Sequence, residues 1–193
     1  MPQSRAPESE LIAQLRELNA ALNSHGIVYC AIGGLAVNAH GVVRATHDLD
    51  VMLAAESAES AHNLVLSLGY QPLQPGDEIA SYVRSHTRLD ILFARRAATR
   101  DLLARAIKVD FAGEQIPLIP VEGLLGLKIQ AFNDNPARLR DLQDIIDLVR
   151  THRDRLNLDE VRAYFRLFDR EIVLDDILQA TRNTGADGTQ AGS

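Results

Sequence analysis

The order of apolar and polar residues along the chain predicts a mixed α/β protein. Leu11, Leu15, Leu18 and Leu22 recur at helical spacing, so the first element is expected to be an amphipathic helix. A short continuous apolar run is instead typical of a buried strand. On these criteria, the first part of the chain contains helices at 9–24, 34–40 and 58–68, and strands at 27–32 and 49–53.

The middle of the chain has the pattern of two hairpins, and the last third is helical. Apolar strands flank two short turns, Ser85-His86-Thr87 and Ala112-Gly113-Glu114. From Pro120 the apolar period becomes that of helices, and Pro136 is suited to the first turn of one of them. The predicted strands are 79–84, 88–93, 107–111 and 115–119, the predicted helices are 98–105, 121–133, 136–150, 158–168 and 171–180, and 72–76 is predicted to be a loop.

These elements predict an α/β (α+β) fold in which a mixed β-sheet is flanked by helices and followed by a C-terminal helical region. No internal repeat is apparent. The expected organisation is a disordered lead (1–8), an α/β core (9–120), a helical part packed on the core (121–180) and a polar, glycine-rich, disordered tail (181–193).

Composition and charge narrow the class of protein. The net charge of −6 argues against a broad, sequence-independent grip on nucleic acid. No apolar run approaches the ~18–20 residues needed to span a bilayer, and the first residues lack the apolar core of a signal peptide. The single cysteine, Cys30, lies in a strand pattern and is expected to be a small buried hydrophobe. We therefore expect a cytoplasmic protein with no membrane partner.

The most informative motif is Gly33-Gly34 followed by Asp48-Leu49-Asp50. The glycine pair stands between a strand and a helix, where backbone N–H groups can hold phosphate oxygens; the alternative is a tight turn without a ligand. Residues i and i+2 of a strand share a face, so Asp48 and Asp50 should lie side by side. Two adjacent carboxylates repel each other, and a divalent cation makes the arrangement favourable.

Asp90 is a third acidic candidate, in a strand where Leu89, Ile91 and Phe93 face the other way. Beside Asp48 and Asp50 it would complete a cluster able to hold two magnesium ions for an in-line phosphoryl displacement. In that scheme Asp48 and Asp50 bridge both metals, while Asp90 binds one and helps to deprotonate the acceptor hydroxyl. The alternative is that each aspartate caps a strand or pairs with a nearby arginine, Arg44 or Arg88. Arg44 and Thr46 are also candidates for contact with phosphate or the nucleotide sugar.

A third group of candidates lies in the helical region. Lys128 interrupts an apolar helical run and is one of only two lysines among twenty basic residues. A compact point charge suits a triphosphate, although a lysine in this position more often extends to the surface. Arg138, Asp141 and Asp144 follow at helical spacing, so that neighbouring members share a face; an ordinary solvated helix face is the alternative.

Together, Gly33-Gly34, Arg44-x-Thr46-x-Asp48-Leu49-Asp50 and Leu89-Asp90-Ile91 resemble the nucleotidyltransferase superfamily typified by DNA polymerase β. The run 121–128, ending in Lys128, and the following Arg138-x-x-Asp141-x-x-Asp144 look like the AbiEii-type branch, which includes toxins and minimal nucleotidyltransferases. The resemblance covers roughly residues 27–150. Gly34 stands where numerous members carry serine, so this position lacks their hydroxyl.

The resemblance implies a nucleotidyltransferase core, magnesium (two ions) and transfer of a nucleoside monophosphate from a nucleoside triphosphate such as ATP, with release of pyrophosphate. It implies catalytic roles for Asp48, Asp50, Asp90 and Lys128, with the three aspartates as metal ligands. Nucleotide binding falls to the motif residues Gly33, Gly34, Arg44, Thr46, Lys128 and Asp144.

The resemblance also bears on partners. The AbiEii-type branch implies a macromolecular acceptor, tRNA or protein, in a toxin–antitoxin context with an antitoxin partner. Two alternatives remain open: an adenylyltransferase acting on a small molecule such as an antibiotic, and a non-catalytic nucleotide-binding or antitoxin-like module.

Overall fold

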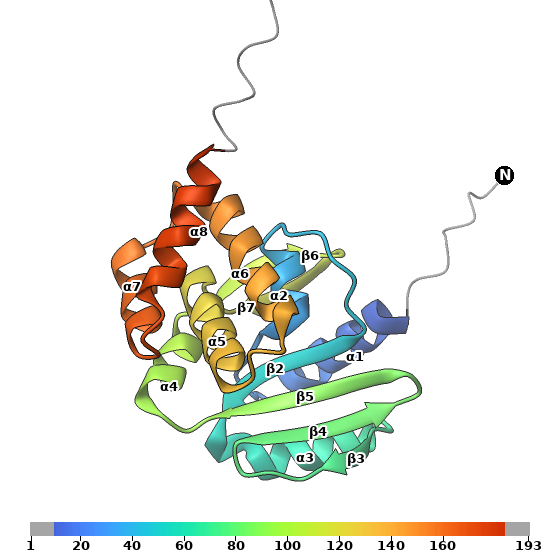
Figure 1. Cartoon of the computed structure of the whole chain (residues 1–193). Coiled ribbons are helices and arrows are strands. Elements are labelled where there is room, and N and C mark those ends of the chain that lie inside the picture. The colour runs from blue at the N-terminus through green and yellow to red at the C-terminus, as the bar shows by residue number, and fades with distance from the viewer. Residues whose placement is uncertain (1–9, 184–193) are drawn as a thin grey trace, which may run out of the picture. The chain divides into compact units, whose positions relative to one another are not determined.

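The computed structural model describes residues 10–183, with side chains described as far as Thr181. These residues form a seven-stranded mixed sheet and eight α-helices (Figure 1), which confirms the predicted α/β class. The predicted disordered lead, 1–8, lies outside the described residues, as do residues 184–193 of the predicted tail. Residues 181–183 were expected in that tail, but they are helical.

The described residues fall into two compact units. The α/β unit comprises residues 10–39 and 44–120 and contains the whole sheet. The helical unit comprises residues 40–43 and 121–183. Each unit is described below by itself.

The sheet of the α/β unit has the strand order β3-β4-β5-β2-β1-β7-β6. At its centre β2 and β5 run parallel, whereas β1 and β4 are antiparallel to their neighbours β2 and β5. The strands are β1 (Tyr29–Ala31), β2 (Asp48–Ala54), β3 (Gln71–Gln74), β4 (Ile79–Arg84), β5 (Thr87–Ala94), β6 (Ile107–Phe111) and β7 (Glu114–Leu118).

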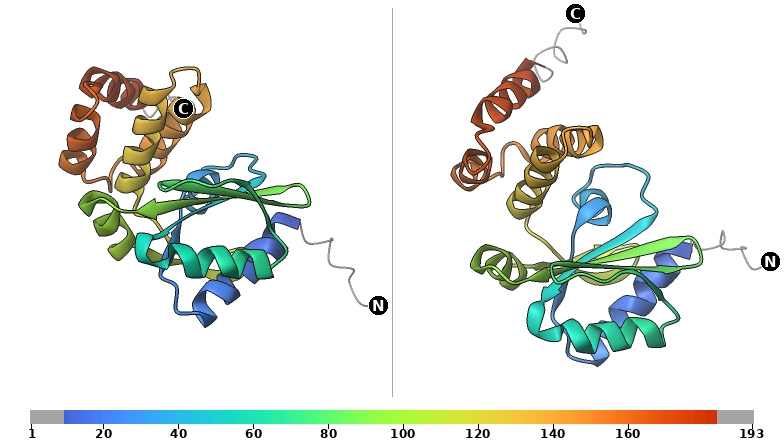
Figure 2. Two further views of the ribbon diagram at one scale, coloured as in Figure 1. Left: turned by 90° about the horizontal axis from the view of Figure 1, so that it is seen from below. Right: turned by 60° about the horizontal axis from the view of Figure 1, so that its bottom comes forward.

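Four α-helices and one 3-10 helix complete the α/β unit. They are α1 (Glu10–Ser24), α2 (Gly33–Ala39), η1 (Ala55–Ser57), α3 (Ala58–Ser67) and α4 (Ala97–Ala104). Figure 2 shows α1 and α3 on one face of the sheet and α2 on the other. The sheet core is formed by alternate residues of the central strands, because period-2 side chains alternate between faces: Leu49, Val51 and Leu53 of β2 are almost fully buried.

Buried tyrosine hydroxyls tie α1 to the rest of this unit. Tyr29 donates a hydrogen bond to Asn19 Oδ1 at 2.7 Å, and Tyr70 donates one to Gln14 Oε1 at 2.8 Å. Asn19 and Gln14 are themselves buried. A buried polar atom without a partner would cost free energy, so these bonds fix how the helix lies on the sheet.

Two expectations about local structure are wrong. The predicted loop at 72–76 contains most of β3, an exposed edge strand that pairs with β4 and is interrupted by a register shift. Its polar residues and Pro72 are typical of a loop, so the sequence pattern does not indicate a strand. Proline is nevertheless tolerated in a strand at a sheet edge. The helix expected from Pro136 begins at Leu139, because the Asn135 side chain accepts a hydrogen bond from the Ala137 N–H and holds a turn there. The other helices and strands are present, with ends shifted by at most three residues.

The helical unit contains α5 (Val121–Asp134), α6 (Leu139–His152), α7 (Leu158–Arg166) and α8 (Glu171–Asn183). Its core includes Ile129, Leu148 and Phe165, all fully buried. A Cβ on Gly126 would lie 2.9 Å from the Tyr164 ring, so glycine allows α5 and α7 to approach closely. Residues 40–43 join this unit through His152, whose Nε2 donates a hydrogen bond to the His40 carbonyl at 2.7 Å.

Within residues 10–183, no helix combines the length and the apolar character needed to cross a membrane.

Candidate active site

Four charged side chains form a square on the two central parallel strands. In the register between β2 and β5, Asp48 is opposite Arg88 and Asp50 is opposite Asp90. Asp48 and Asp50 are two residues apart, as are Arg88 and Asp90, so all four project from the same face of the sheet. Leu49, between the two β2 aspartates, points into the core and is fully buried. The structure therefore brings together the three carboxylates that the sequence singled out.

Asp50 is seated against the start of α2 by the glycine pair. The Gly34 N–H donates a hydrogen bond to Asp50 Oδ2 at 3.3 Å. Gly33 has a φ of +60°, and a Cβ there would lie 2.1 Å from the same carboxylate oxygen. Only glycine combines this backbone conformation with this close approach. In this structure the glycine pair thus positions a carboxylate.

Gly34 also makes room for two side chains that precede the aspartates. A Cβ on Gly34 would lie 2.1 Å from Arg44 Nη2 and 2.7 Å from Thr46 Oγ1. The Arg44 backbone N–H donates to Asn38 Oδ1 at 3.1 Å, which ties the segment before β2 to α2. The candidates Arg44 and Thr46 therefore lie beside the glycine pair. Numerous members of the superfamily that the motif resembles carry serine at the position of Gly34. A serine here would displace the side chain of Arg44 or Thr46.

Arg88 is the cation of the square. Its Nε donates to Asp90 Oδ1 at 2.8 Å, and its Nη2 donates to Ser81 Oγ at 3.0 Å. Ser81 is buried on β4, directly opposite Asp90 in the antiparallel register. The hydrogen bond to Asp90 is the largest cause of a raised Arg88 pKa, to which the charges of Asp90, Asp48 and Asp50 also contribute. Arg88 therefore interacts electrostatically with all three carboxylates.

The donor set fits magnesium in its chemistry, because three carboxylates gathered on one sheet face supply the oxygen ligands that this ion prefers. In residues 10–183, however, no group of three or more histidine, cysteine, aspartate or glutamate side chains is arranged so that it could hold a metal ion. Asp90 Oδ1 is engaged by Arg88 and Asp50 Oδ2 by the Gly34 N–H. A guanidinium thus supplies positive charge where the sequence suggested a metal.

Lys128 and the acidic residues of α6 form a second charged cluster, within the helical unit. Lys128 Nζ lies 2.7 Å from both Asp141 Oδ1 and Asp144 Oδ2, and Arg138 Nε lies 2.5 Å from Asp141 Oδ2. Lys128 and both aspartates are buried, whereas Arg138 is exposed. The structure therefore joins Lys128, Arg138, Asp141 and Asp144 in one ion-pair network. Lys128 does not extend to the surface, and Asp141 and Asp144 do not lie on a solvated helix face, because all three side chains are buried.

The sequence between residues 3 and 180 matches the model of a family described as "Uncharacterised nucleotidyltransferase". The chain belongs to this nucleotidyltransferase family. No curated protein is significantly similar to it in sequence.

Solved structures share the fold of this nucleotidyltransferase. One is ANT(2″)-Ia in complex with adenylyl-2″-tobramycin, with a TM-score of 0.66 and 16% identity over 83% of this chain and 98% of that one. Another is an antigenic nucleotidyltransferase-like protein from Paracoccidioides brasiliensis, with a TM-score of 0.59 and 19% identity over 90% and 94% of the two chains. The lincomycin-bound lincosamide adenylyltransferase LnuA has a TM-score of 0.54 and 18% identity over 74% and 96%.

Two residues of the candidate site have a weak signal or none in the sequence. The sequence indicates Arg88 only as a possible partner of an aspartate, and it gives no indication of Ser81. Asp90 and Arg88 share a strand and a face, which the period-2 pattern predicts. The approach of Ser81 depends on how β4 pairs with β5, and the hairpin turn at 85–87 was the available signal for that pairing.

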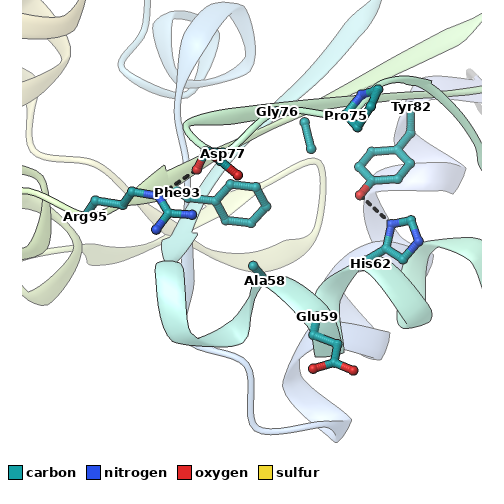
Figure 3. Close-up of a pocket in the computed structure, with 10 residues that line it drawn as sticks. Ala58, Glu59, His62, Pro75, Gly76, Asp77, Tyr82, Phe93 and Arg95 are labelled. Carbon is teal, nitrogen blue, oxygen red and sulfur yellow. Dashed lines mark hydrogen bonds between the residues drawn. The ribbon is translucent and has the colours of Figure 1, made fainter.

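The nucleotidyltransferase also has a pocket of about 250 Å³ between α3 and the strands β4 and β5 (Figure 3). Tyr82 and Phe93 line it, and the Tyr82 hydroxyl is hydrogen-bonded to His62 Nδ1 at 3.0 Å. Side chains alternate between the two faces along a strand, and by the register of β4 and β5 those of Tyr82 and Phe93 lie on the face opposite to that of Asp90. The pocket therefore opens on the opposite face of the sheet from the carboxylates.

Cys30 is a structural residue, as expected. It is fully buried in β1, and burial raises the pKa of its thiol to about 12. At neutral pH the thiol is protonated and out of reach of solvent, so it is unsuited to nucleophilic chemistry.

Proposed function

We propose that this chain is a magnesium-dependent nucleotidyltransferase that moves a nucleoside monophosphate from a nucleoside triphosphate to an acceptor hydroxyl. The observation that carries the proposal is the register of the central strands, which puts Asp90 directly beside Asp50 and on the same face as Asp48. Three adjacent carboxylates repel one another, and cations make such a cluster favourable. Membership of a nucleotidyltransferase family supports the same chemistry.

In this proposal Asp48, Asp50 and Asp90 would hold two magnesium ions, and these would supply positive charge to the phosphates in an in-line displacement. Asp90 accepts the proton of the acceptor hydroxyl. The acceptor oxygen forms a bond to the α-phosphorus, the bond from that phosphorus to the bridging oxygen breaks, and pyrophosphate leaves with the bonding electron pair.

The remaining candidates position the nucleotide. Arg44 and Thr46 lie beside Gly34, where a guanidinium and a hydroxyl are suited to phosphate or sugar oxygens. Gly33 and Gly34 keep Asp50 in place and leave space for these two side chains. The resemblance assigns nucleotide contacts to Lys128 and Asp144 as well. Their buried ion pair supports a positioning contribution, since it gives Lys128 a single fixed place in the helical unit.

For the acceptor, the branch resemblance supports a macromolecule, tRNA or protein, and a toxin that is held by an antitoxin partner in the cytoplasm. The observation favouring this branch is that Lys128, Asp141 and Asp144, which belong to the stretch that resembles it, form one network in the structure.

A small hydroxylated acceptor is the second candidate. It is supported by the fold shared with ANT(2″)-Ia, which was solved with adenylyl-2″-tobramycin, and with LnuA, which was solved with lincomycin. This chain spans almost the full length of both.

The test follows the label from each of the four α-³²P nucleoside triphosphates in the presence of Mg²⁺. Parallel reactions contain total tRNA, proteins of a cell lysate, or a panel of aminoglycosides and lincosamides. Label in tRNA or protein supports the macromolecular acceptor, and label in a small product supports the second candidate.

The variants Asp48→Asn and Asp50→Asn remove one negative charge each and keep the side-chain volume. Both should abolish transfer while their thermal unfolding remains cooperative. Transfer at the wild-type rate in either variant contradicts the proposed mechanism. Absence of magnesium-dependent nucleotide binding in the wild-type chain by calorimetry would instead favour a non-catalytic module.

A further inference from the structure

The square of charges on β2 and β5 contains a cation of its own, and this has a consequence for metal binding. Arg88 stands opposite Asp48 in the strand register and diagonally from Asp50, and its guanidinium bonds Asp90. Removal of Arg88 would leave three carboxylates on one face of two neighbouring strands. The arginine therefore relieves the repulsion that a divalent cation would otherwise relieve.

A dication bound by Asp90 would lie close to the Arg88 guanidinium, and the two positive charges would repel each other. Arg88 Nε donates to Asp90 Oδ1 at 2.8 Å, so the guanidinium already supplies positive charge to this carboxylate. Arg88 therefore competes electrostatically with a cation for Asp90.

The Arg88 guanidinium is held by a hydrogen bond to Ser81, yet its ion pair with Asp90 is exposed enough to be broken. Its Nη2 donates to Ser81 Oγ at 3.0 Å, so it is tethered to the neighbouring strand β4. Yet 48% of the Arg88 side chain and 25% of the Asp90 side chain are exposed. An ion pair this exposed contributes little net stability, so a dication can displace it.

We propose that Arg88 is an internal counter-ion of the three aspartates that competes with the divalent cation for Asp90, so that metal binding releases the guanidinium. The inference rests on the proposed function, because it takes the carboxylates as the metal site. Arg88 is a positioning residue in this scheme: it offsets part of the negative charge of the cluster before the cation arrives and sets how tightly the cation binds.

The test measures Mn²⁺ binding to the full chain without nucleotide, from the loss of the electron paramagnetic resonance signal of free Mn²⁺. Arg88→Gln should bind Mn²⁺ about tenfold more tightly than wild type, because one positive charge leaves the site. Arg88→Lys keeps the charge but loses the planar fork, and should remain within about threefold of wild type. Circular dichroism checks that each variant is folded.

Arg96→Gln is the matched control. It makes the same change of charge in the same unit, at an arginine that is exposed and paired with Glu78. It should leave the Mn²⁺ affinity close to that of wild type. Asp50→Asn, introduced into wild type and into Arg88→Gln, should abolish tight binding in both and so locate the ion at the cluster.

The outcomes separate this inference from the proposed function. Wild-type Mn²⁺ binding that Asp50→Asn abolishes, with an Arg88→Gln affinity equal to or weaker than that of Arg96→Gln, overturns the counter-ion role and leaves the metal site standing. Absence of Mn²⁺ binding at the cluster in both wild type and Arg88→Gln overturns both.

Discussion

Gly33 lies so close to Asp50 that the two positions constrain each other. A Cβ on Gly33 would approach Asp50 Oδ2 to 2.1 Å and Asp50 Cγ to 2.4 Å, and Gly33 has a φ of +60°. The carboxylate central to the proposed site therefore occupies the space that any other residue at position 33 would need.

Gly33→Ala should therefore impair both stability and activity. We expect the free energy of unfolding to fall by about 2–3 kcal/mol, from the strained backbone and the displaced carboxylate. Gly26→Ala is the matched control, since its φ is +64° and a Cβ there meets nothing within 4 Å. It should lose only about 1 kcal/mol and retain nucleotidyl transfer. Equal losses of stability and activity in the two variants, by urea denaturation and transfer assay, would contradict the steric argument.

Asp90→Asn should remove the proposed proton acceptor and one metal ligand while preserving the fold. We expect transfer to fall by a factor of about 10²–10⁴, the usual contribution of a positioned general base. The amide oxygen can still accept from Arg88, so thermal unfolding should change little. The measurement is single-turnover transfer with wild type in parallel, and a loss of less than about threefold would exclude Asp90 from the chemistry.

Lys128→Met should destabilise the chain strongly, because it leaves Asp141 and Asp144 buried without their shared cation. Breaking a buried ion pair by removing one partner costs about 3–5 kcal/mol. Lys108→Met, at the other lysine, which is exposed, should change stability by less than about 0.5 kcal/mol. Chemical denaturation of the two variants makes the comparison.

A double variant tests the nucleotide-binding role that the resemblance implies for Lys128 and Asp144. Lys128→Met with Asp144→Asn removes one charge of each sign and should recover part of the lost stability. Nucleotide affinity, measured by calorimetry on that folded double variant, should still fall if the Lys128–Asp144 pair contacts the nucleotide. An unchanged affinity would make the cluster purely structural.

Alkaline pH should destabilise the α/β unit through its buried acids. Burial raises the pKa of Cys30 from 9.0 to about 12 and that of Tyr70 from 10.0 to about 12. Below about pH 8 both groups are protonated in the folded and unfolded states. As the pH rises from about 8 towards 12, mainly the unfolded state loses these protons, so the free energy of unfolding decreases.

The thiol's share of this loss can be isolated, because its unfolded pKa is the lowest. Between pH 8 and 10, urea denaturation should show a smaller decrease for Cys30→Ala than for wild type. Identical pH dependence of the two proteins would show that the Cys30 thiol does not contribute.

Much of the local structure follows from the sequence because its causes are local. The apolar period of 9–24 predicted α1, and the turn residues at 85–87 and 112–114 predicted the two hairpins. The i, i+2 spacing of Asp48 and Asp50 fixed their common face as soon as a strand was assigned there. The sequence of β3 nevertheless predicts a loop, because this exposed edge strand carries no apolar alternation and is formed by its pairing with β4.

The sequence by itself singled out the candidates for the chemistry: the glycine pair, the three aspartates and Lys128 with its acidic partners. Only the tertiary structure decided how they meet. Strand pairing is non-local, so the register that puts Asp90 beside Asp50 and Arg88 opposite Asp48 has no signature within either strand. The same holds for Ser81, which bonds Arg88 because β4 lies beside β5, and for Lys128, whose burial depends on how α6 packs against α5.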